Sequence, residues 1–225
     1  MATKIIVSYD GTDNDLDALA LGRLLAEAGA SIALAYVRHA QEVESGRERL
    51  AESEAKALLA AGANVLGNPD VPQFVVISGS TPEGLRTLAL AEHADVIVFG
   101  SEYRTAPGHV DPQASARRLL DGGAFALAFA PAGFADQTGY KVKTIAAISE
   151  AGDPCARETA EALASKLGAT VAEHASSDID LVVVGSKRGA VTGRVTISAA
   201  AEYLIELSNC PVIVVPRGVT VHFDS

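Results

Sequence analysis

The sequence predicts an α/β fold in which helices cover both faces of a parallel sheet, and it predicts this fold twice in one chain. Short apolar runs rich in valine and isoleucine alternate with helical segments, which is typical of βαβ crossovers. The pattern restarts after residue 142. The two copies then end in segments that align without a gap, QASARRLLDGGAFALAFAPAG (113–133) and SAAAEYLIELSNCPVIVVPRG (198–218).

The first copy contains a full set of elements. Its apolar runs predict five buried strands, at residues 3–9, 31–37, 73–78, 95–99 and 125–129. Helices are predicted between them. One covers 14–29 and ends at Gly29, a charged one covers 42–63, and a third is opened by Ser80-Thr81-Pro82-Glu83.

The second copy is shorter. It repeats a strand (143–148), a helix (154–168), a weak strand (169–174) and a strand (178–186), but lacks the equivalents of the long helix, the third strand and the helix after it. Only about five residues, 175–179, separate its second and third strands, whereas a parallel crossover takes a dozen or more. The weak strand is therefore expected to be short, displaced or reversed.

These patterns divide the chain into four parts. We predict a complete domain at 1–132, a linker at 133–142, a reduced domain at 143–218 and a tail at 219–225. The tail, VTVHFDS, alternates apolar and polar residues and could extend a sheet edge or reach another subunit.

The composition narrows the class of protein. The 225 residues carry a formal net charge of −10, which argues against nucleic acid or an anionic membrane as the main partner. We expect neither a signal peptide nor a membrane span. Cys155 and Cys210 indicate neither a disulfide framework nor a metal site, so the default setting is the cytoplasm. Cys155 opens a helix and is either a reactive thiol or a plain small residue.

Several segments resemble the universal stress protein family. They are IIVSYDGTDNDLDALALG near the start, SGSTPEGLRTLALAEHADVIVFGS in the middle of the first copy, and the endings of both copies, clearest in NCPVIVVPRG. The resemblance covers nearly the whole chain. It implies two Rossmann-like domains of the HUP (adenine-nucleotide α-hydrolase-like) class, with strand order 3-2-1-4-5 in the first copy and a reduced sheet in the second.

The resemblance also implies where a nucleotide would bind. In nucleotide-binding members an aspartate after strand 1 and a backbone group after strand 2 hold the adenosine, and a G-x2-G-x9-G-[ST] loop wraps the phosphates. Glycines let the backbone approach the ligand, and helix N-terminal amides face the anion.

The first copy matches this pattern at its adenosine end only. Asp10, Val37 and Gly100 occupy the aspartate, strand-2 and first-glycine positions. The second glycine, third glycine and hydroxyl positions hold Tyr103, Gln113 and Ala114. Asp111-Pro112 is predicted to cap the following helix, which would place a carboxylate where a phosphate would bind. A charge at a helix end contributes about 0.3–1 kcal/mol.

The second copy shows the reverse defect. Gly185 is kept, and the loop after it is basic and flexible because of Lys187, Arg188, Gly189, Gly193 and Arg194. The remaining motif positions hold Arg188, Ser198 and Ala199. Thr196 or Ser198 would cap the helix without charge, so the segment could bind an anion.

The adenosine end of the second copy is incomplete. The aspartate position holds Ser149, and Asp153-Pro154 is expected to cap the next helix.

We therefore expect a non-enzymatic stress-response or regulatory protein with degenerate nucleotide sites and weak or absent ATP binding. One alternative is an ATP- or AMP-binding regulator that uses Asp10 and the Gly100 loop, and another is a ligand-free interaction module. A further alternative is a nucleotide-handling enzyme, but the sequence offers no base, metal-binding carboxylate pair or nucleophile that would support it. No cofactor or metal is expected, with ATP the one candidate ligand. Members of the family commonly associate through the edge of the last strand, so the resemblance implies that the copies pair through 125–129 (FALAF) and 211–215 (PVIVV), which would cover two strand edges. Whole chains could also form a homodimer or bind an unknown protein partner.

Overall fold

The computed structural model describes residues 2–39, 48–149, 152–172 and 178–223, without the side chains of 48–51. Its strands are β1 (Lys4–Ser8), β2 (Ser31–His39), β3 (Gln73–Ser78), β4 (Val96–Phe99), β5 (Ala126–Phe129), β6 (Thr144–Ile148), β7 (Thr170–Ala172), β8 (Leu181–Gly185) and β9 (Val212–Val215). Its helices are α1 (Asp13–Glu27), α2 (Glu48–Leu66), α3 (Thr81–Glu92), α4 (Ala114–Leu120), the 3-10 turn η2 (Phe134–Asp136), α5 (Cys155–Leu167) and α6 (Ala199–Leu207).

The described strands form one nine-stranded sheet in the order β3-β2-β1-β4-β5-β9-β8-β6-β7. Lobe one, β1 to β5 with α1 to α4, has the predicted order 3-2-1-4-5 with every pairing parallel. Lobe two contains β6 to β9 with α5 and α6, and among its described residues no strand takes the place of β3. Its weak second strand, β7, is three residues long and parallel to β6, so it is short and not reversed.

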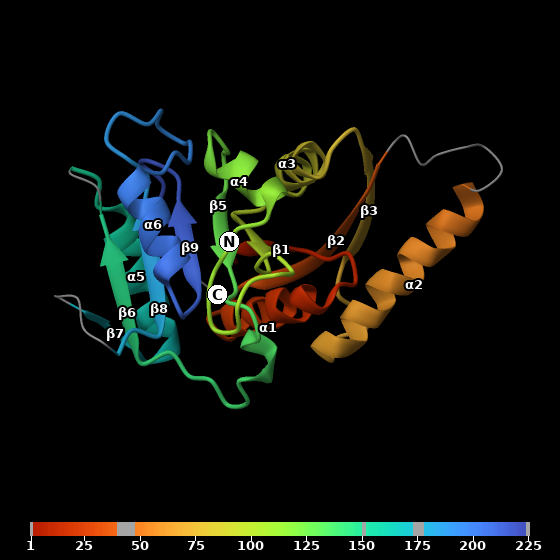
Figure 1. Ribbon diagram of the computed structural model, residues 1–225, viewed down its shortest axis with the longest axis horizontal. Coiled ribbons are helices and arrows are strands. Elements are labelled where there is room, and N and C mark those ends of the chain that lie inside the picture. Colours follow the sequence, from red (N-terminus) through yellow and green to blue (C-terminus); the bar gives the residue numbers. More distant parts are fainter. Residues whose placement is uncertain (1, 40–47, 150–151, 173–177, 224–225) are drawn as a thin grey trace.

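The two lobes join through β5 and β9, as the sequence predicted. These strands pair antiparallel, with Ala128 opposite Ile213 (Figure 1). The pairing merges the two expected sheets into one and removes two exposed strand edges.

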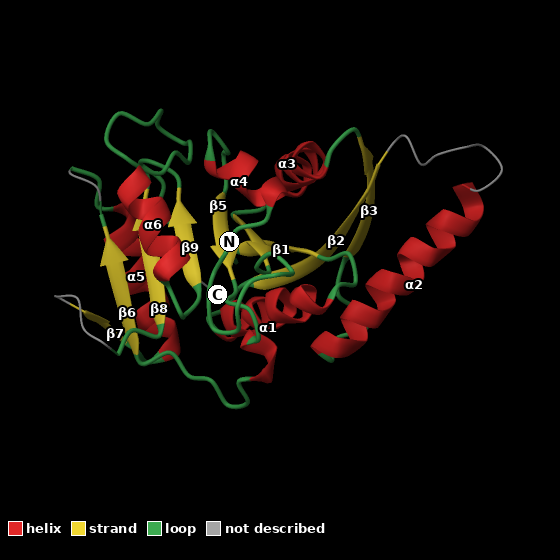
Figure 2. Ribbon diagram, in the orientation of Figure 1, coloured by secondary structure: helices red, strands yellow, loops and turns green. Residues whose placement is uncertain are grey.

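Helices cover both faces of this sheet (Figure 2). One apolar cluster packs α1, α2 and α5 against one face, and the other packs α3, α4 and α6 against the opposite face. The sheet residues in both clusters are mostly valine, isoleucine and alanine, because a parallel sheet buried on both sides needs apolar side chains on both sides.

The absence of an α3 counterpart among the described residues of lobe two leaves apolar surface exposed. Leu119 of α4 lies beside α3 and is 5% exposed, whereas Leu204, its equivalent in α6, is 41% exposed. Tyr203 and Leu207 of α6 are exposed as well.

The boundaries differ from the prediction in two helical regions. Helix α1 ends at Glu27 with Gly29 at positive φ just beyond, and Ser80 caps α3, as expected. The long helix begins at Glu48, and the start of its predicted range lies outside the described residues. The segment predicted as a linker contains η2, whose Phe134 is buried against Tyr140.

The described residues of the tail, 219–223, form no strand, which corrects the expectation that it could extend a sheet edge. Val221 and Phe223 are buried, and the Val221 N–H donates to the Thr159 hydroxyl of α5 at 3.0 Å. The Thr3 hydroxyl donates to the carbonyl of His222. The tail thus packs between the start of lobe one and a helix of lobe two, because its alternate apolar side chains have a core to enter there.

Candidate functional site

The edge where the resemblance predicts a nucleotide in lobe one lies at the carboxyl ends of β1 and β4, where the strand order reverses. Asp10 follows β1 and is exposed, and Gly100 directly follows β4 and is buried. A Cβ atom on Gly100 would lie 2.0 Å from the backbone oxygen of Asn14. Glycine is needed at this position because the first turn of α1 passes directly over it.

Asp15 fills the turn between β1 and α1, and sequence reasoning missed it. Its carboxylate accepts hydrogen bonds from the backbone N–H groups of Asp10 (2.6 Å), Gly11 (2.9 Å) and Thr12 (3.3 Å). Successive amides of this kind form an anion-binding concavity. Here the chain's own carboxyl group occupies the concavity. The pattern Thr12-x-x-Asp15, which resembles a capping box, is the signal that could have revealed it.

The Asp15 carboxyl group is buried close to a second acid. Burial raises the pKa of Asp15 to about 8, assisted by the hydrogen bond to the Asp10 side chain and by the Asp10 charge, while N–H donors from Asp10 and Thr12 oppose the rise. Desolvation favours the neutral form of a carboxyl group. The Asp15 carboxyl group at the end of β1 therefore favours its neutral form.

The rest of the adenosine end is closely packed. A Cβ atom on Gly11 would lie 2.4 Å from Leu58 Cδ1, so α2 presses on the turn. Val37 is not the last residue of its strand, which corrects the prediction, because β2 continues to His39. Val37 is buried against Gly84 of α3, whose added Cβ would lie 2.8 Å from Val37 Cγ1.

The loop after β4 is folded into a closed hairpin. The buried Ser101 hydroxyl donates to the carbonyl of Ala130 (2.7 Å) and accepts from the N–H of Asp111 (3.2 Å). The Glu102 N–H donates to the carbonyl of Asp111 at 2.8 Å. Tyr103, at the second glycine position, is 65% exposed and stacks under the Arg104 guanidinium. The N–H groups of Glu102 and Asp111 are thus already paired within the loop.

The predicted Asp111 cap is wrong. Helix α4 begins at Ala114 with Gln113 at its N-cap, and no side chain caps it. Asp111 instead accepts from Arg117 Nη2 at 2.6 Å. The nearby guanidinium pairs with the Asp111 carboxylate and draws it away from the helix amides. The predicted like-charge repulsion between an Asp111 cap and a phosphate at this helix end is therefore not supported.

The loop of lobe two repeats the hairpin of lobe one. Gly185 ends β8, and the Ser186 hydroxyl donates to the carbonyl of Val215 (2.8 Å) and accepts from the N–H of Thr196 (3.3 Å). Lys187, Arg188 and Gly189 are exposed at the start of the loop. Ser198 caps α6 by accepting from the N–H of Ala201 at 3.2 Å, as predicted.

Lobe two differs at its adenosine end. Val98 of β4 and Val183 of β8 are equivalent residues. Val7 pairs with Val98 and Ala147 pairs with Val183, so Val7 and Ala147 are equivalent as well. The same offset places the equivalent of Asp10 at position 150 and not at Ser149. Position 150 lies outside the described residues. Asp153 accepts from the N–H groups of Cys155 (3.1 Å) and Gly218 (3.0 Å), so it holds both the start of α5 and the end of the lobe.

Cys155 opens α5, as expected, but it is not an activated thiol. Its side chain is buried, and burial raises the pKa of the Cys155 thiol, assisted by Asp153. Helix position alone would lower this pKa. The interpretation as a plain small residue is therefore the better one.

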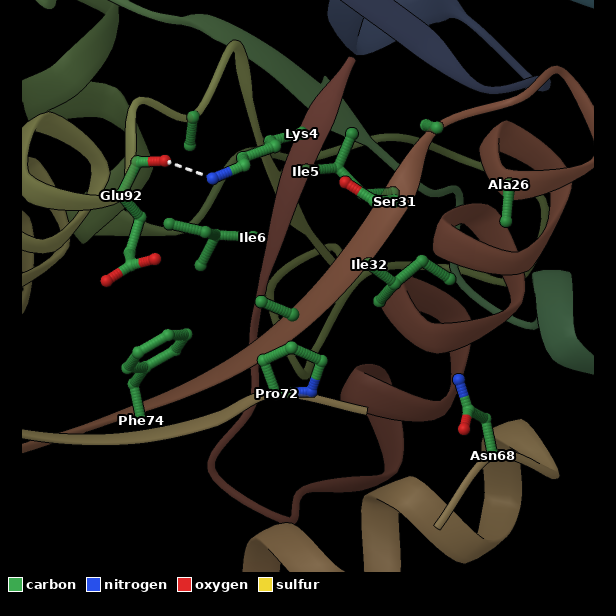
Figure 3. A pocket seen from close by; sticks show the side chains of 13 residues that line it. Lys4, Ile5, Ile6, Ala26, Ser31, Ile32, Asn68, Pro72, Phe74 and Glu92 are labelled. Carbon is green, nitrogen blue, oxygen red and sulfur yellow. Dashed lines mark hydrogen bonds between the residues drawn. The ribbon is translucent and has the colours of Figure 1, made fainter. Parts of the chain in front are cut away.

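A well-formed pocket of about 390 Å³ lies at the opposite, amino-terminal edge of the lobe-one sheet (Figure 3). It forms because β3 begins level with Leu34, so the first three residues of β2 extend beyond it. Apolar residues such as Ile32 and Phe74 line it, and Lys4 Nζ donates to the carbonyl of Glu92 at its rim at 3.0 Å. Its position separates it from Asp10 and Gly100.

Two further features of the described residues bear on ligands. No group of three or more His, Cys, Asp or Glu side chains among them is placed to hold a metal ion. None of the helices in the part of the chain that the structure describes is long and apolar enough to cross a bilayer.

Comparison with solved structures shows the fold. The universal stress protein from Archaeoglobus fulgidus DSM 4304 is similar over 96% of this chain and 98% of its own, with a TM-score of 0.63 and 16% identity. A functionally unknown protein from Pseudomonas aeruginosa PAO1 is similar over 96% of this chain and 93% of its own, with a TM-score of 0.63 and 14% identity. A comparison with curated proteins found no match.

The sequence comparison reaches both lobes. The model of the universal stress protein family matches residues 1–110 and again residues 129–216. These two matches cover more than half of the chain and follow the internal repeat, with β1 to β4 in the first and β6 to β9 in the second. The chain belongs to the universal stress protein family, in tandem form.

Proposed function

We propose that this chain is a non-enzymatic stress-response or regulatory protein whose two nucleotide sites bind ATP weakly or not at all. The observation that carries the proposal is the Asp15 carboxyl group, which accepts the N–H groups of Asp10, Gly11 and Thr12 at the end of β1. A ligand that used these amides would have to displace contacts that the chain already makes, and would leave a buried carboxyl group without them.

The closed loops give a second, independent support. Ser101 and Ser186 each tie the start of their loop to its end and to the neighbouring strand. A loop that wraps phosphates must offer its backbone N–H groups to the ligand. Opening either hairpin would break several hydrogen bonds before one to a phosphate could form.

The same serines support a role without catalysis. Both hydroxyl groups are buried, and the hydrogen bonds that they make within the described residues are all with main-chain atoms. A serine nucleophile needs an adjacent base that takes its proton. We therefore assign Ser101 and Ser186 to loop closure.

Equilibrium binding of labelled ATP tests the proposal. We expect a Kd of about 1 mM or weaker, which corresponds to roughly −4 kcal/mol, and no change in the Asp10→Ala variant. Asp70→Ala removes an exposed carboxylate elsewhere and serves as the control. A low-micromolar Kd that Asp10→Ala abolishes would overturn the proposal and favour the ATP- or AMP-binding regulator. Native mass spectrometry of the purified protein shows whether nucleotide remains bound.

A weak anion site in lobe two is a second candidate. Lys187 and Arg188 are exposed beside the N-terminus of α6, whose Ser198 cap is uncharged. Titration with pyrophosphate should show weak, salt-sensitive binding that the Lys187→Ala/Arg188→Ala variant loses. Lys141→Ala/Arg157→Ala removes the same charge at a distance. Equal weakening in both variants would mean that net charge, and not this loop, attracts the anion.

We also propose a cytoplasmic setting and action through protein contacts. Cys155 and Cys210 are free thiols, in agreement with a reducing compartment. The exposed Tyr203 and Leu207 of α6 offer apolar surface to a partner protein or a second copy. Sedimentation velocity over a concentration series, compared between the native chain and Leu207→Glu, tests for a homodimer that uses this surface. An association that Leu207→Glu leaves unchanged would refute it.

A further inference from the structure

The lobes meet through pairs of equivalent positions. Arg117 and Glu202 are separated by 85 residues, and the same step relates the residues of the lobe interface. The N–H of Val110 donates to the carbonyl of Ser208 (3.2 Å), and that of Val195 donates to the carbonyl of Gly123 (2.7 Å). Each bond is the counterpart of the other. The interface is therefore close to twofold symmetric, with equivalent residues facing each other near the axis.

The charges at this axis break the symmetry. Arg117 of α4 and Glu202 of α6 occupy equivalent positions and form an ion pair, with Nη1 and Oε1 3.0 Å apart. Arg117 Nη2 also lies 3.1 Å from Glu206 Oε1 and 2.6 Å from Asp111 Oδ1. One guanidinium thus joins two carboxylates from lobe two and one from its own lobe.

Pairing between identical lobes would lose this balance. Two copies of lobe two would place Glu202 against Glu202, with Glu206 of each copy alongside and no cation in the position of Arg117. Two copies of lobe one would place Arg117 against Arg117, but Asp121, the equivalent of Glu206, would lie alongside, so the mismatch is greater between two copies of lobe two. Like charges at facing positions disfavour an interface and select against the wrong partner.

We propose that the cluster of Arg117, Glu202 and Glu206 makes the two lobes mutually selective. Strand β9 pairs with β5 of lobe one, because that lobe presents a cation, Arg117, opposite Glu202. A second copy of lobe two lacks this cation, so pairing of β9 with a second β9 is disfavoured. The selectivity holds the pairing within the chain and does not depend on nucleotide binding. The side chains of these three residues and of Asp111 are 38% to 52% exposed, so salt should weaken the effect.

Charge reversal in the full chain tests the proposal. Arg117→Glu should lower the urea midpoint of unfolding, and the loss should shrink in high salt. The double variant Arg117→Glu/Glu202→Arg should recover at least half of that loss, because it restores the pair with its signs exchanged. Arg157→Glu reverses one partner of a comparable pair on α5, with Nε and Oε1 3.0 Å apart, and should change the midpoint little.

Amide hydrogen exchange separates pairing from general stability. In Arg117→Glu, exchange should rise about tenfold in β5 (Ala126–Phe129) and β9 (Val212–Val215), because a tenfold rise corresponds to a loss of about 1.4 kcal/mol at the lobe interface. Exchange in β1 and β6 should change little. The proposal fails if exchange rises uniformly through both lobes, if the double variant is no better than Arg117→Glu, or if Arg157→Glu costs as much.

Discussion

The Asp15 side chain accepts a hydrogen bond from the N–H of Asp10 at 2.6 Å. Sequence reasoning singled out Asp10 and overlooked Asp15, although the two residues are bonded to each other. The aspartate after strand 1 would otherwise be free to orient toward a ligand. In this chain it belongs to a turn that is closed by a second, buried carboxyl group.

This pairing predicts an unusual pH dependence of stability. In the folded chain Asp15 keeps its proton up to about pH 8, whereas the ordinary pKa is 3.8. Folding therefore takes up a proton between about pH 4 and pH 8, and the free energy of unfolding should fall as pH rises through this window. Each pKa unit corresponds to about 1.4 kcal/mol. Urea unfolding at pH 5 and pH 8 should show the fall, and Asp15→Asn should reduce it.

Asp13→Asn is the matched control, because it removes an exposed carboxyl group from the same turn of α1. Asp17 contributes in the same direction, since burial raises its pKa against the N–H donors of Ala135 and Gly133. A pH profile that is identical in the native chain and in Asp15→Asn would contradict the assignment.

Gly100→Ala should destabilise lobe one. The new Cβ would lie 2.0 Å from a backbone oxygen that cannot move without shifting α1. Overpacking of this kind costs about 1–3 kcal/mol or more. Gly79→Ala is the control, because its Cβ would approach only Glu83 Oε2, at 3.6 Å. Thermal unfolding should show a lower midpoint for Gly100→Ala alone, and equal midpoints would refute the close approach.

Ser101→Ala and Ser186→Ala should have similar effects in their two lobes. Each removes a buried hydroxyl and leaves a main-chain N–H and a carbonyl without that partner, at a cost of about 1–3 kcal/mol. Urea denaturation measures the loss. The exposed Ser165→Ala on α5 should be nearly neutral. A much smaller loss in either buried variant would mean that water readily replaces the hydroxyl.

Leu119→Ala and Leu204→Ala should differ although the positions are equivalent. Leu119 is buried under α3 and its truncation should cost about 2–5 kcal/mol, whereas Leu204 is 41% exposed and should cost less than about 1 kcal/mol. Chemical denaturation of both variants makes the comparison. Equal losses would show that Leu204 is covered by another part of the protein.

The apolar runs of the sequence predicted the strands, and the resemblance to the family predicted their order in lobe one and the pairing of the lobes. Apolar runs such as Val96–Phe99 and Val212–Val215 are buried on both faces, so their pattern leaves little choice of structure. The step of 85 residues between the endings made the pairing of Ala128 with Ile213 foreseeable.

The details of the site were less predictable, because they depend on contacts between distant segments. Asp111 looks like a helix cap in one dimension, but the Arg117 guanidinium draws its side chain aside. The tail looked like an edge strand, but Phe223 finds an apolar core to enter. In both cases a tertiary contact replaced the structure that the local sequence favours.

The bond between Thr3 and His222 places residue 3 next to residue 222. The backbone between these two residues therefore runs nearly as a closed ring, and a short cross-link could join residues 3 and 222 without disturbing the sheet. Handles for optical tweezers attached there would pull first on the tail, so its detachment from α5 should precede the rupture of either lobe.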